Sequence, residues 1–176
     1  MNRLLLVAVL STLSACQSLH LQGRQGEDSP NFQIPAGSKL VLHQDLAIPA
    51  PVGATYLQHG RAGAFHEINE FVPYCLLEQR PSEGTTKTVR AGEFVIATVR
   101  QEFRFAGAGA RQLVAAGQSF QPTHVVATVL ELRSDSAPHS LYLSCAHWGM
   151  PQSMSHLTLR DIRDALGDVA SLELER

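Results

Sequence analysis

The sequence predicts a mainly β protein: an antiparallel sandwich or barrel of about seven or eight strands with one short C-terminal helix. Two observations predict this class. From residue 34 onwards, short stretches that alternate apolar and polar residues recur along the chain, separated by turns that contain Gly, Pro or Ser. Near the C-terminus, a single stretch instead repeats its apolar residues at the spacing of a helix. Many short strands of this kind are typical of a sandwich or barrel.

The predicted strands follow one another along this whole region. In chain order they cover residues 39–43, 54–60, 70–79, two strands within 86–105 around a turn at Ala91 and Gly92, and then 124–133, 139–148 and 168–174. The segments 124–133 and 139–148 predict a hairpin, because only the short sequence SDSAP lies between them.

The clearest alternation lies in the second half of 86–105. It predicts a half-buried antiparallel strand with an apolar inner face and a charged outer face. The residues predicted to share the inner face are Val95, Ala97, Val99, Phe103 and Phe105, and those predicted to share the outer face are Arg100, Glu102 and Arg104.

The helix is predicted in the sequence SHLTLRDIRDALGD. Thr158 can cap its first turn, with Asp161 three residues later in the position of a capping box. Gly167 supplies a C-terminal stop. The apolar residues at helical spacing between these signals are Leu159, Ile162 and Leu166.

The first fifteen residues have the three-part organisation of a secretory signal peptide. A positive head at Arg3 precedes an apolar run from Leu4 to Leu13, and small residues follow. The run is shorter than the roughly 20 residues that span a bilayer. A buried N-terminal helix is the alternative, but such a helix should be amphipathic, whereas this one is apolar on all sides.

The sequence Leu13-Ser14-Ala15-Cys16 resembles the lipobox of bacterial lipoproteins. The resemblance implies that the Cys16 sulfur carries a lipid and that the chain is cut before Cys16, which leaves the protein bound to a membrane through its acyl chains. Residue 17 is Gln and not Asp, which resembles the class sorted to the outer membrane, facing the periplasm. The implied organisation is a signal peptide at 1–15, a lipidated cysteine with a flexible tether at 16–33, and a single β-rich domain at 34–176.

The rest of the chain loosely resembles uncharacterised periplasmic lipoproteins of proteobacteria. Three segments carry the resemblance: LAIPAPVGATYLQHG, VPYCLLE and AGEFVIA. It implies a place in the cell envelope and transfers no catalytic residues.

Cys75 and Cys145 are the two cysteines that remain once Cys16 is assigned to lipid. In an oxidising compartment an even pair favours a disulfide. The alternation of their strands also places both side chains on apolar faces, Cys75 with Phe71 and Leu77, and Cys145 with Leu143. The alternative is two separate buried thiols. We therefore predict a disulfide between Cys75 and Cys145.

Composition and charge limit the possible partners. The chain has 14 basic and 16 acidic residues, a formal net charge of −2, and no basic block. Nucleic acid is therefore not an expected partner. The expected partners are the membrane, through the lipid anchor, and an envelope protein.

The sequence gives no signal for a metal or cofactor. Of the eight histidines, His59 and His66 lie seven residues apart, and His139 and His147 begin and end one predicted strand. Neither pair has the spacing of a local zinc clamp. We predict no metal site and no cofactor.

Catalytic motifs are also lacking. The chain contains no Gly-x-Ser-x-Gly elbow and no Ser-x-x-Lys sequence. Asp45, Glu67 and Glu70 are candidate paired acids, but solvated loop charges explain them equally well. Trp148 and Tyr142 share the strand face opposite Cys145, where they either pack in a second core layer, the favoured interpretation, or line a ligand surface.

The resulting functional hypothesis is a membrane-anchored, non-enzymatic accessory or binding module of the cell envelope. The alternatives are a small-molecule or metal binder in a barrel mouth and, less favoured, an envelope hydrolase. An exposed apolar patch would favour the first, a pocket with convergent polar groups the second, and a nucleophile with its base and orienting group the third.

Overall fold

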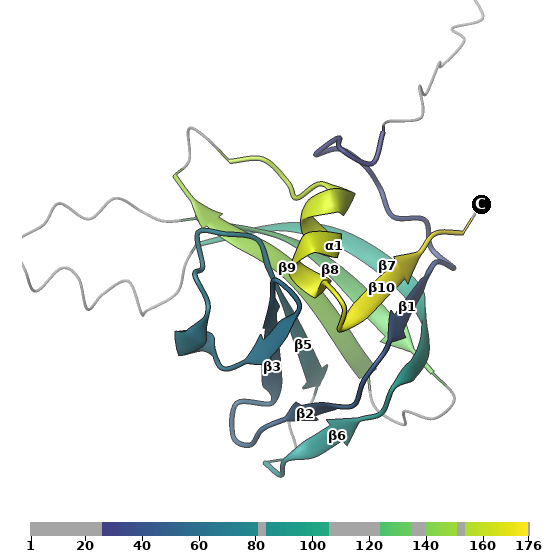
Figure 1. Ribbon diagram of the computed structural model, residues 1–176. Helices are drawn as coiled ribbons and strands as arrows, with labels where there is room; N and C mark the ends of the chain where they lie inside the picture. Colours follow the sequence, from purple (N-terminus) through teal and green to yellow (C-terminus); the bar gives the residue numbers. More distant parts are fainter. Residues whose placement is uncertain (1–25, 81–83, 106–123, 135–139, 151–153, 176) are drawn as a thin grey trace, which may run out of the picture.

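The described residues form an eight-stranded antiparallel sheet that curves into a half-barrel around one α-helix (Figure 1). The computed structural model describes residues 26–80, 84–105, 124–134, 140–150 and 154–175, and Cys16 and the signal peptide lie outside these ranges. The strand order is β10-β1-β7-β8-β9-β5-β3-β4, and β2 and β6 form a separate two-stranded ribbon. The bounds are β1 (Lys39–Leu42), β2 (Leu46–Ile48), β3 (Ala54–Gln58), β4 (Arg61–Gly63), the 3-10 turn η1 (Phe65–Glu67), β5 (Tyr74–Arg80), β6 (Lys87–Val89), β7 (Gly92–Phe105), β8 (His124–Arg133), β9 (Ser140–Gly149), α1 (Leu159–Leu166) and β10 (Ala170–Glu173). The predicted mainly β class with one C-terminal helix is confirmed.

The hydrophobic core lies between α1 and the inner face of the sheet (Figure 1). Alternate residues of the strands point inward, and the helix buries one stripe against them. The helical residues in this core are Leu159, Ile162, Ala165 and Leu166, each at most 2% exposed. The predicted hairpin is present, since β8 pairs with β9 along nine residue pairs from His124–Gly149 to Leu132–Leu141.

A β-bulge in β7 changes which residues face inward. The register with β8 shifts directly after Ile96, so Ala97 is the extra residue. Before the bulge, Phe94 and Ile96 are buried and Val95 is 45% exposed. The prediction that Val95 shares the inner face with Val99 is therefore wrong, because one inserted residue exchanges the two faces of a strand.

The segment 86–105 contains two strands that do not pair with each other. β6 pairs with β2, whereas β7 pairs with β1 and β8. The Ala91 N–H donates a hydrogen bond of 2.8 Å to Asp45 Oδ1 where the chain passes from the ribbon to the main sheet. The predicted turn at Ala91 and Gly92 thus connects the β2–β6 ribbon to the main sheet and does not close a hairpin.

The fifth strand begins later than its sequence predicts. β5 begins at Tyr74, directly after Pro73, which has no N–H to donate to a neighbouring strand. Phe71, predicted to share a face with Cys75, lies in the preceding loop and is 60% exposed.

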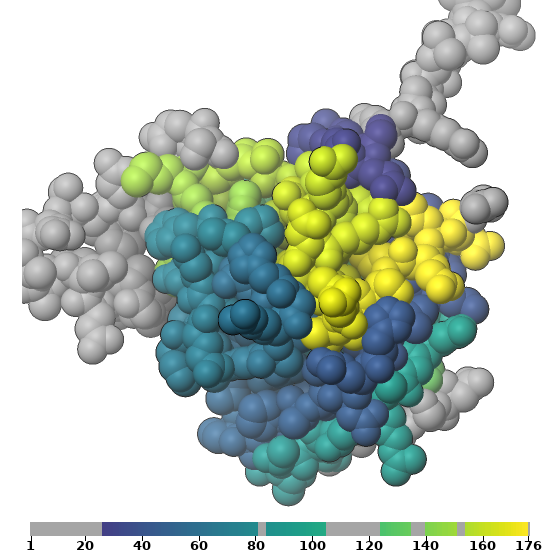
Figure 2. Space-filling view, in the orientation of Figure 1, coloured from purple at the N-terminus to yellow at the C-terminus, as the bar shows by residue number. Residues whose placement is uncertain are grey.

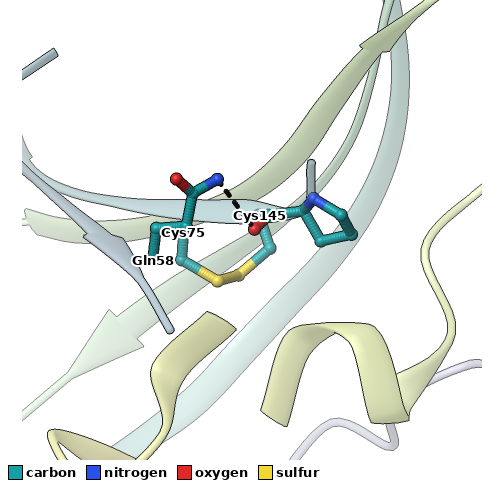
Figure 3. The surroundings of a disulfide bond; sticks show 4 residues. Gln58, Cys75 and Cys145 are labelled. Atoms are coloured by element: carbon teal, nitrogen blue, oxygen red, sulfur yellow. Dashed lines mark hydrogen bonds between the residues drawn. A yellow bond between two sulfur atoms is a disulfide. The ribbon is translucent and has the colours of Figure 1, made fainter. Parts of the chain in front are cut away.

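The predicted disulfide between Cys75 and Cys145 is confirmed. The two residues face each other across β5 and β9, with a Cα–Cα distance of 3.9 Å and an S–S distance of 2.06 Å. Both are fully buried in the core beneath α1. Figure 3 shows the sulfur atoms and the amide of Gln58 on opposite sides of the sheet.

Both predicted ends of α1 are also confirmed. The Asp161 N–H donates to Thr158 Oγ1 at 3.1 Å, and the Thr158 N–H donates to Asp161 Oδ2 at 2.8 Å, which completes a capping box. At the other end, the Gly167 N–H donates to the Arg163 carbonyl, and Gly167 has a φ of 50°. A residue with a side chain rarely adopts this conformation.

The C-terminal end of α1 supports the turn between β3 and β4. The Gly60 N–H donates to the Ala165 carbonyl at 3.1 Å. A Cβ placed on Gly167 would lie only 2.5 Å from the Gly60 Cα. The two glycines therefore allow the helix and the turn to approach more closely than any side chain would permit.

Residues 27 and 28 contact α1 along its length, from Leu159 to Arg163. Arg163 pairs with Glu27, and Arg160 makes two contacts with the Asp28 carboxylate, at 2.8 and 3.0 Å. The Leu159 N–H donates to the Glu27 carbonyl at 3.0 Å. The contacts of the domain thus extend into the segment predicted as tether.

Candidate functional site

Five aromatic side chains gather where the ends of β3, β5 and β9 meet the loop between β4 and β5. We call them the aromatic surface: Tyr56, Phe65, Phe71, Tyr74 and Trp148. Trp148 contacts Phe71 edge-on, with ring centroids 6.1 Å apart, and Phe65 at 6.3 Å. Tyr56 joins Phe65 to Tyr74, with centroid distances of 5.3 and 6.0 Å. Phe65 and Phe71 are 44% and 60% exposed, so the surface presents apolar rings to solvent.

The aromatic surface rests on a second, smaller hydrophobic cluster on the outer face of the sheet, opposite α1. Small buried residues in β8 and β9 leave room there for the larger rings. The buried members are Tyr74, Ala127, Val129 and Ala146, and the half-buried residues packed on them include Tyr56, Ile68, Tyr142 and Trp148. Burial raises the pKa of Tyr74, and it raises that of Tyr56 together with the charge of Glu78. Both tyrosines are therefore neutral apolar platforms at physiological pH.

The side chain of Gln58 holds the loop that carries both exposed phenylalanines. Its Nε2 donates to the carbonyls of Asn69 at 2.8 Å, Val72 at 3.2 Å and Pro73 at 3.3 Å. Its Oε1 accepts the Asn69 N–H at 2.9 Å. Figure 3 shows this side chain on the side of the sheet away from the disulfide. The side-chain amide of Gln58 thus provides hydrogen-bond partners for backbone groups at both ends of segment 69–73.

Further hydrogen bonds fix the loop internally. The Ala64 N–H donates to Glu67 Oε2 at 2.6 Å, and the Phe71 N–H donates to Asn69 Oδ1 at 3.1 Å. The backbone N–H of Trp148 donates to the Glu70 carbonyl at 2.7 Å. The exposed rings are therefore mounted on a fixed backbone, a property of preorganised binding surfaces.

We expect Gln58→Leu to lower the free energy of unfolding by about 1–2 kcal/mol, because it leaves part-buried backbone groups without partners. The exchange of the Asn69 N–H with deuterium should accelerate by a larger factor, since that hydrogen bond is lost directly. Gln79→Leu is the matched control. Gln79 is 8% exposed, and its Nε2 has no hydrogen-bond partner among the described residues, so its replacement should leave stability unchanged or raise it. Equal loss in both variants would contradict the assigned role of Gln58.

A pocket adjoins the aromatic surface between the β3–β4 hairpin and the 3-10 turn. Its volume is about 560 Å³, and it is open to solvent. The lining residues are Gln58, His59, Arg61, Ala62, Gly63, Glu67 and Ile68. His59 has a φ of 50°, which turns the chain sharply at the pocket wall. The pocket is mixed in character, because the exposed Arg61 and Glu67 and the half-buried Ile68 all line it.

The histidines are dispersed. His59 lines the pocket, and His66 lies in η1. His147 and His156 lie at one end of the half-barrel, where His156 contacts Phe103 edge-on at 5.8 Å. Burial lowers the pKa of both, although Asp161 opposes the change at His147. Among the described residues, no three His, Cys, Asp or Glu side chains gather as metal ligands.

Two of the three candidate paired acids accept hydrogen bonds from backbone amides in separate parts of the fold. Asp45 accepts a hydrogen bond from the Ala91 backbone, and Glu67 accepts one from Ala64. His43 Nε2 lies 3.0 Å from Ser171 Oγ at an exposed position, which brings a base to a hydroxyl. No carboxylate orients His43 through a hydrogen bond among the described residues, so this pair lacks the third member of a triad.

The strand alternation predicts the sheet face on which the aromatic surface rests, but it favours packing there over a ligand surface. Trp148 and Tyr142 lie on the predicted face, and both pack on the second hydrophobic cluster, the favoured interpretation. Trp148 also flanks the exposed rings. Phe65 and Phe71 were not predicted as site residues. The available signal was their position: large aromatic residues within the polar stretch HGRAGAFHEINE and beside a proline that excludes a strand.

The comparisons with known proteins give no assignment. No family model, curated protein or solved structure matches this chain. The part of the chain that the structure describes has no helix long and apolar enough to cross a membrane.

Proposed function

We propose that this protein is a lipid-anchored binding module of the cell envelope, attached through Cys16 at the outer membrane and acting through its aromatic surface. The observation that carries the proposal is the pair of exposed rings, Phe65 and Phe71, held against Trp148 by a fixed loop. Clustered aromatic residues in a rigid setting are typical of interaction hot spots, because they bury large areas at low entropic cost. The partner that fits is an envelope protein with an apolar anchor residue.

Membrane anchoring would strengthen such an interaction. Linking a binding surface to a membrane raises its effective concentration toward partners in the same layer. The contacts of Glu27 and Asp28 with α1 hold the first described residues against the helix. In Figure 2 the purple N-terminal segment lies at one end of the helix, and the blue to teal segment that contains β3 and η1 lies along its side. This arrangement leaves the loop that carries the phenylalanines free of the attachment point.

A photo-crosslinking experiment in intact cells tests the proposal. A photoreactive phenylalanine analogue at position 71 should give a discrete adduct with an envelope protein. The same analogue at position 52 is the matched control, because Val52 is also an exposed apolar residue, 64% accessible, in the loop at the other end of β3. We expect Phe65→Ala to reduce the adduct about tenfold, the effect of losing roughly 1.4 kcal/mol at a hot spot.

A second arm tests the anchor. Cys16→Ser should abolish incorporation of labelled fatty acid, release the protein from the membrane fraction and reduce the crosslink at position 71. Equal adducts from positions 52 and 71 would contradict the aromatic surface as the binding site. Lipid labelling that persists in Cys16→Ser would contradict the anchor.

A further inference from the structure

Two opposite charges border the pocket beside the aromatic surface without neutralising each other. Arg61 and Glu67 both line it. Among the described residues, Arg61 forms no ion pair, and Glu67 accepts one hydrogen bond, from the Ala64 N–H through Oε2. The Arg61 guanidinium and the second Glu67 oxygen are therefore available to a ligand.

The local backbone keeps these two groups in place. Arg61 begins β4 opposite Gln58, and the Ala64 hydrogen bond holds the Glu67 carboxylate above Gly63. A Cβ on Gly63 would lie 2.4 Å from Glu67 Oε2, so only glycine permits this position. The carboxylate is thus directed by its own backbone and not by Arg61.

We infer that this pocket binds the zwitterionic form of a short peptide, with the ligand carboxylate on Arg61 and the ligand ammonium on Glu67. Arginine binds carboxylates through two parallel hydrogen bonds, and a carboxylate accepts strongly from an ammonium group. The half-buried Ile68 lines the same pocket and offers an apolar contact for a small side chain. A volume of about 560 Å³ lies within the usual range of small-ligand pockets.

The inference goes beyond the proposed function, because it concerns a separate ligand and does not depend on the anchor or on the aromatic surface. Both charged side chains are exposed, and exposed ion pairs are weak. We therefore expect a dissociation constant of about 1 mM for a dipeptide.

The test is a titration of the isotope-labelled full chain in mild detergent, followed by amide chemical shifts. Three probes separate the two contacts: alanyl-alanine, its N-acetylated form and its C-terminal amide. Alanyl-alanine should shift the amides of Gly63 and Glu67 with saturation, and each capped form should bind at least about fivefold more weakly because it lacks one charge contact.

Two variants assign the contacts. Arg61→Gln should remove the preference for a free carboxylate and keep the preference for a free amine. Glu67→Gln should do the reverse, and its amide oxygen can still accept the Ala64 N–H, so the loop is preserved. Gly63→Ala should weaken all three probes by displacing Glu67.

The inference is overturned if no amide of the pocket shifts up to about 20 mM alanyl-alanine, a limit well above the expected constant. It is also overturned if either capped form binds as well as the free dipeptide. Neither result would bear on the crosslink from position 71, which reports the partner of the aromatic surface, so failure here and failure of the proposed function are distinguishable.

Discussion

Replacing both disulfide cysteines with alanine should lower the free energy of unfolding by about 4 kcal/mol, because the bond restricts the unfolded chain across a long loop. Cys75 and Cys145 are 70 residues apart, and the loop between them includes β6, β7 and β8. A loss of that size is a large part of the roughly 5–15 kcal/mol that stabilises a typical domain. Denaturant titration of the full chain measures it, with a midpoint shift and an altered slope that reflects a less compact unfolded state.

Reduction of the wild-type protein is the control for this prediction. Both sulfur atoms are fully buried beneath α1, so reductant should act only once the protein is partly unfolded. The reduced wild type should then match the double variant to within the cost of the two small cavities left by alanine, about 1–2 kcal/mol. A double variant as stable as the oxidised wild type would show that the bond adds nothing beyond the packing of β5 against β9.

Much of this architecture could be predicted because its signals are local. Thr158, Asp161 and Gly167 define α1 within ten residues, and each acts through the backbone of its own helix. The alternation in β9 also indicates correctly which of its faces carries Cys145 and which carries Trp148. In these segments, the apolar pattern and the turn chemistry predict the same structure.

The parts that could not be predicted depend on contacts between distant segments. The bulge at Ala97 reverses the face of Val95, yet an inserted residue leaves no composition signal in a strand that is already apolar. The ribbon of β2 and β6 could not be predicted because it depends on a contact between distant segments. The Ala91 N–H donates to Asp45, which lies 46 residues away in the chain. Strand pairing is determined by the whole sheet, not by the strand itself.

The candidate site shows the same limitation. The alternation of Phe71 with Cys75 predicts a strand that includes both residues. Pro73, however, has no N–H for a continuous ladder of hydrogen bonds between strands, so Phe71 lies in a loop that Gln58 binds. The pocket arises from the hairpin between β3 and β4, whose glycines serve close packing. Arg61 and Glu67, the charged residues of this pocket, belong to no recognisable sequence motif. They become candidates only because the fold places both at one pocket without an ion pair between them.

The close approach of α1 to the β3–β4 turn connects the stability of the domain to the candidate site. The Gly60 N–H donates to the Ala165 carbonyl, and this turn carries His59, which lines the pocket. Displacement of the turn would therefore alter the pocket as well as the packing of the helix.

We expect Gly167→Ala to lower the free energy of unfolding by about 3 kcal/mol, through an unfavourable backbone conformation and a backbone collision. The added Cβ would lie 2.5 Å from the Gly60 Cα and 2.8 Å from the Gly60 nitrogen. Neither contact involves the end of a flexible side chain, so helix and turn must separate, and the hydrogen bond from Gly60 to Ala165 should weaken. Thermal or denaturant unfolding of the full chain measures the loss, and exchange of the Gly60 N–H reports the separation.

Gly84→Ala is the matched control for the collision. Gly84 also has a positive φ, 71°, but a Cβ there would meet no atom of the described residues within 4 Å. That variant should cost only the conformational part, about 1 kcal/mol, and should leave the Gly60 N–H protected. If Gly167→Ala were no more destabilising than Gly84→Ala, the helix and the turn would have room to adjust, and the half-barrel would not depend on the contact between the two glycines. If the loss is larger and the pocket amides shift with it, the C-terminal end of α1 positions the hairpin that carries Arg61.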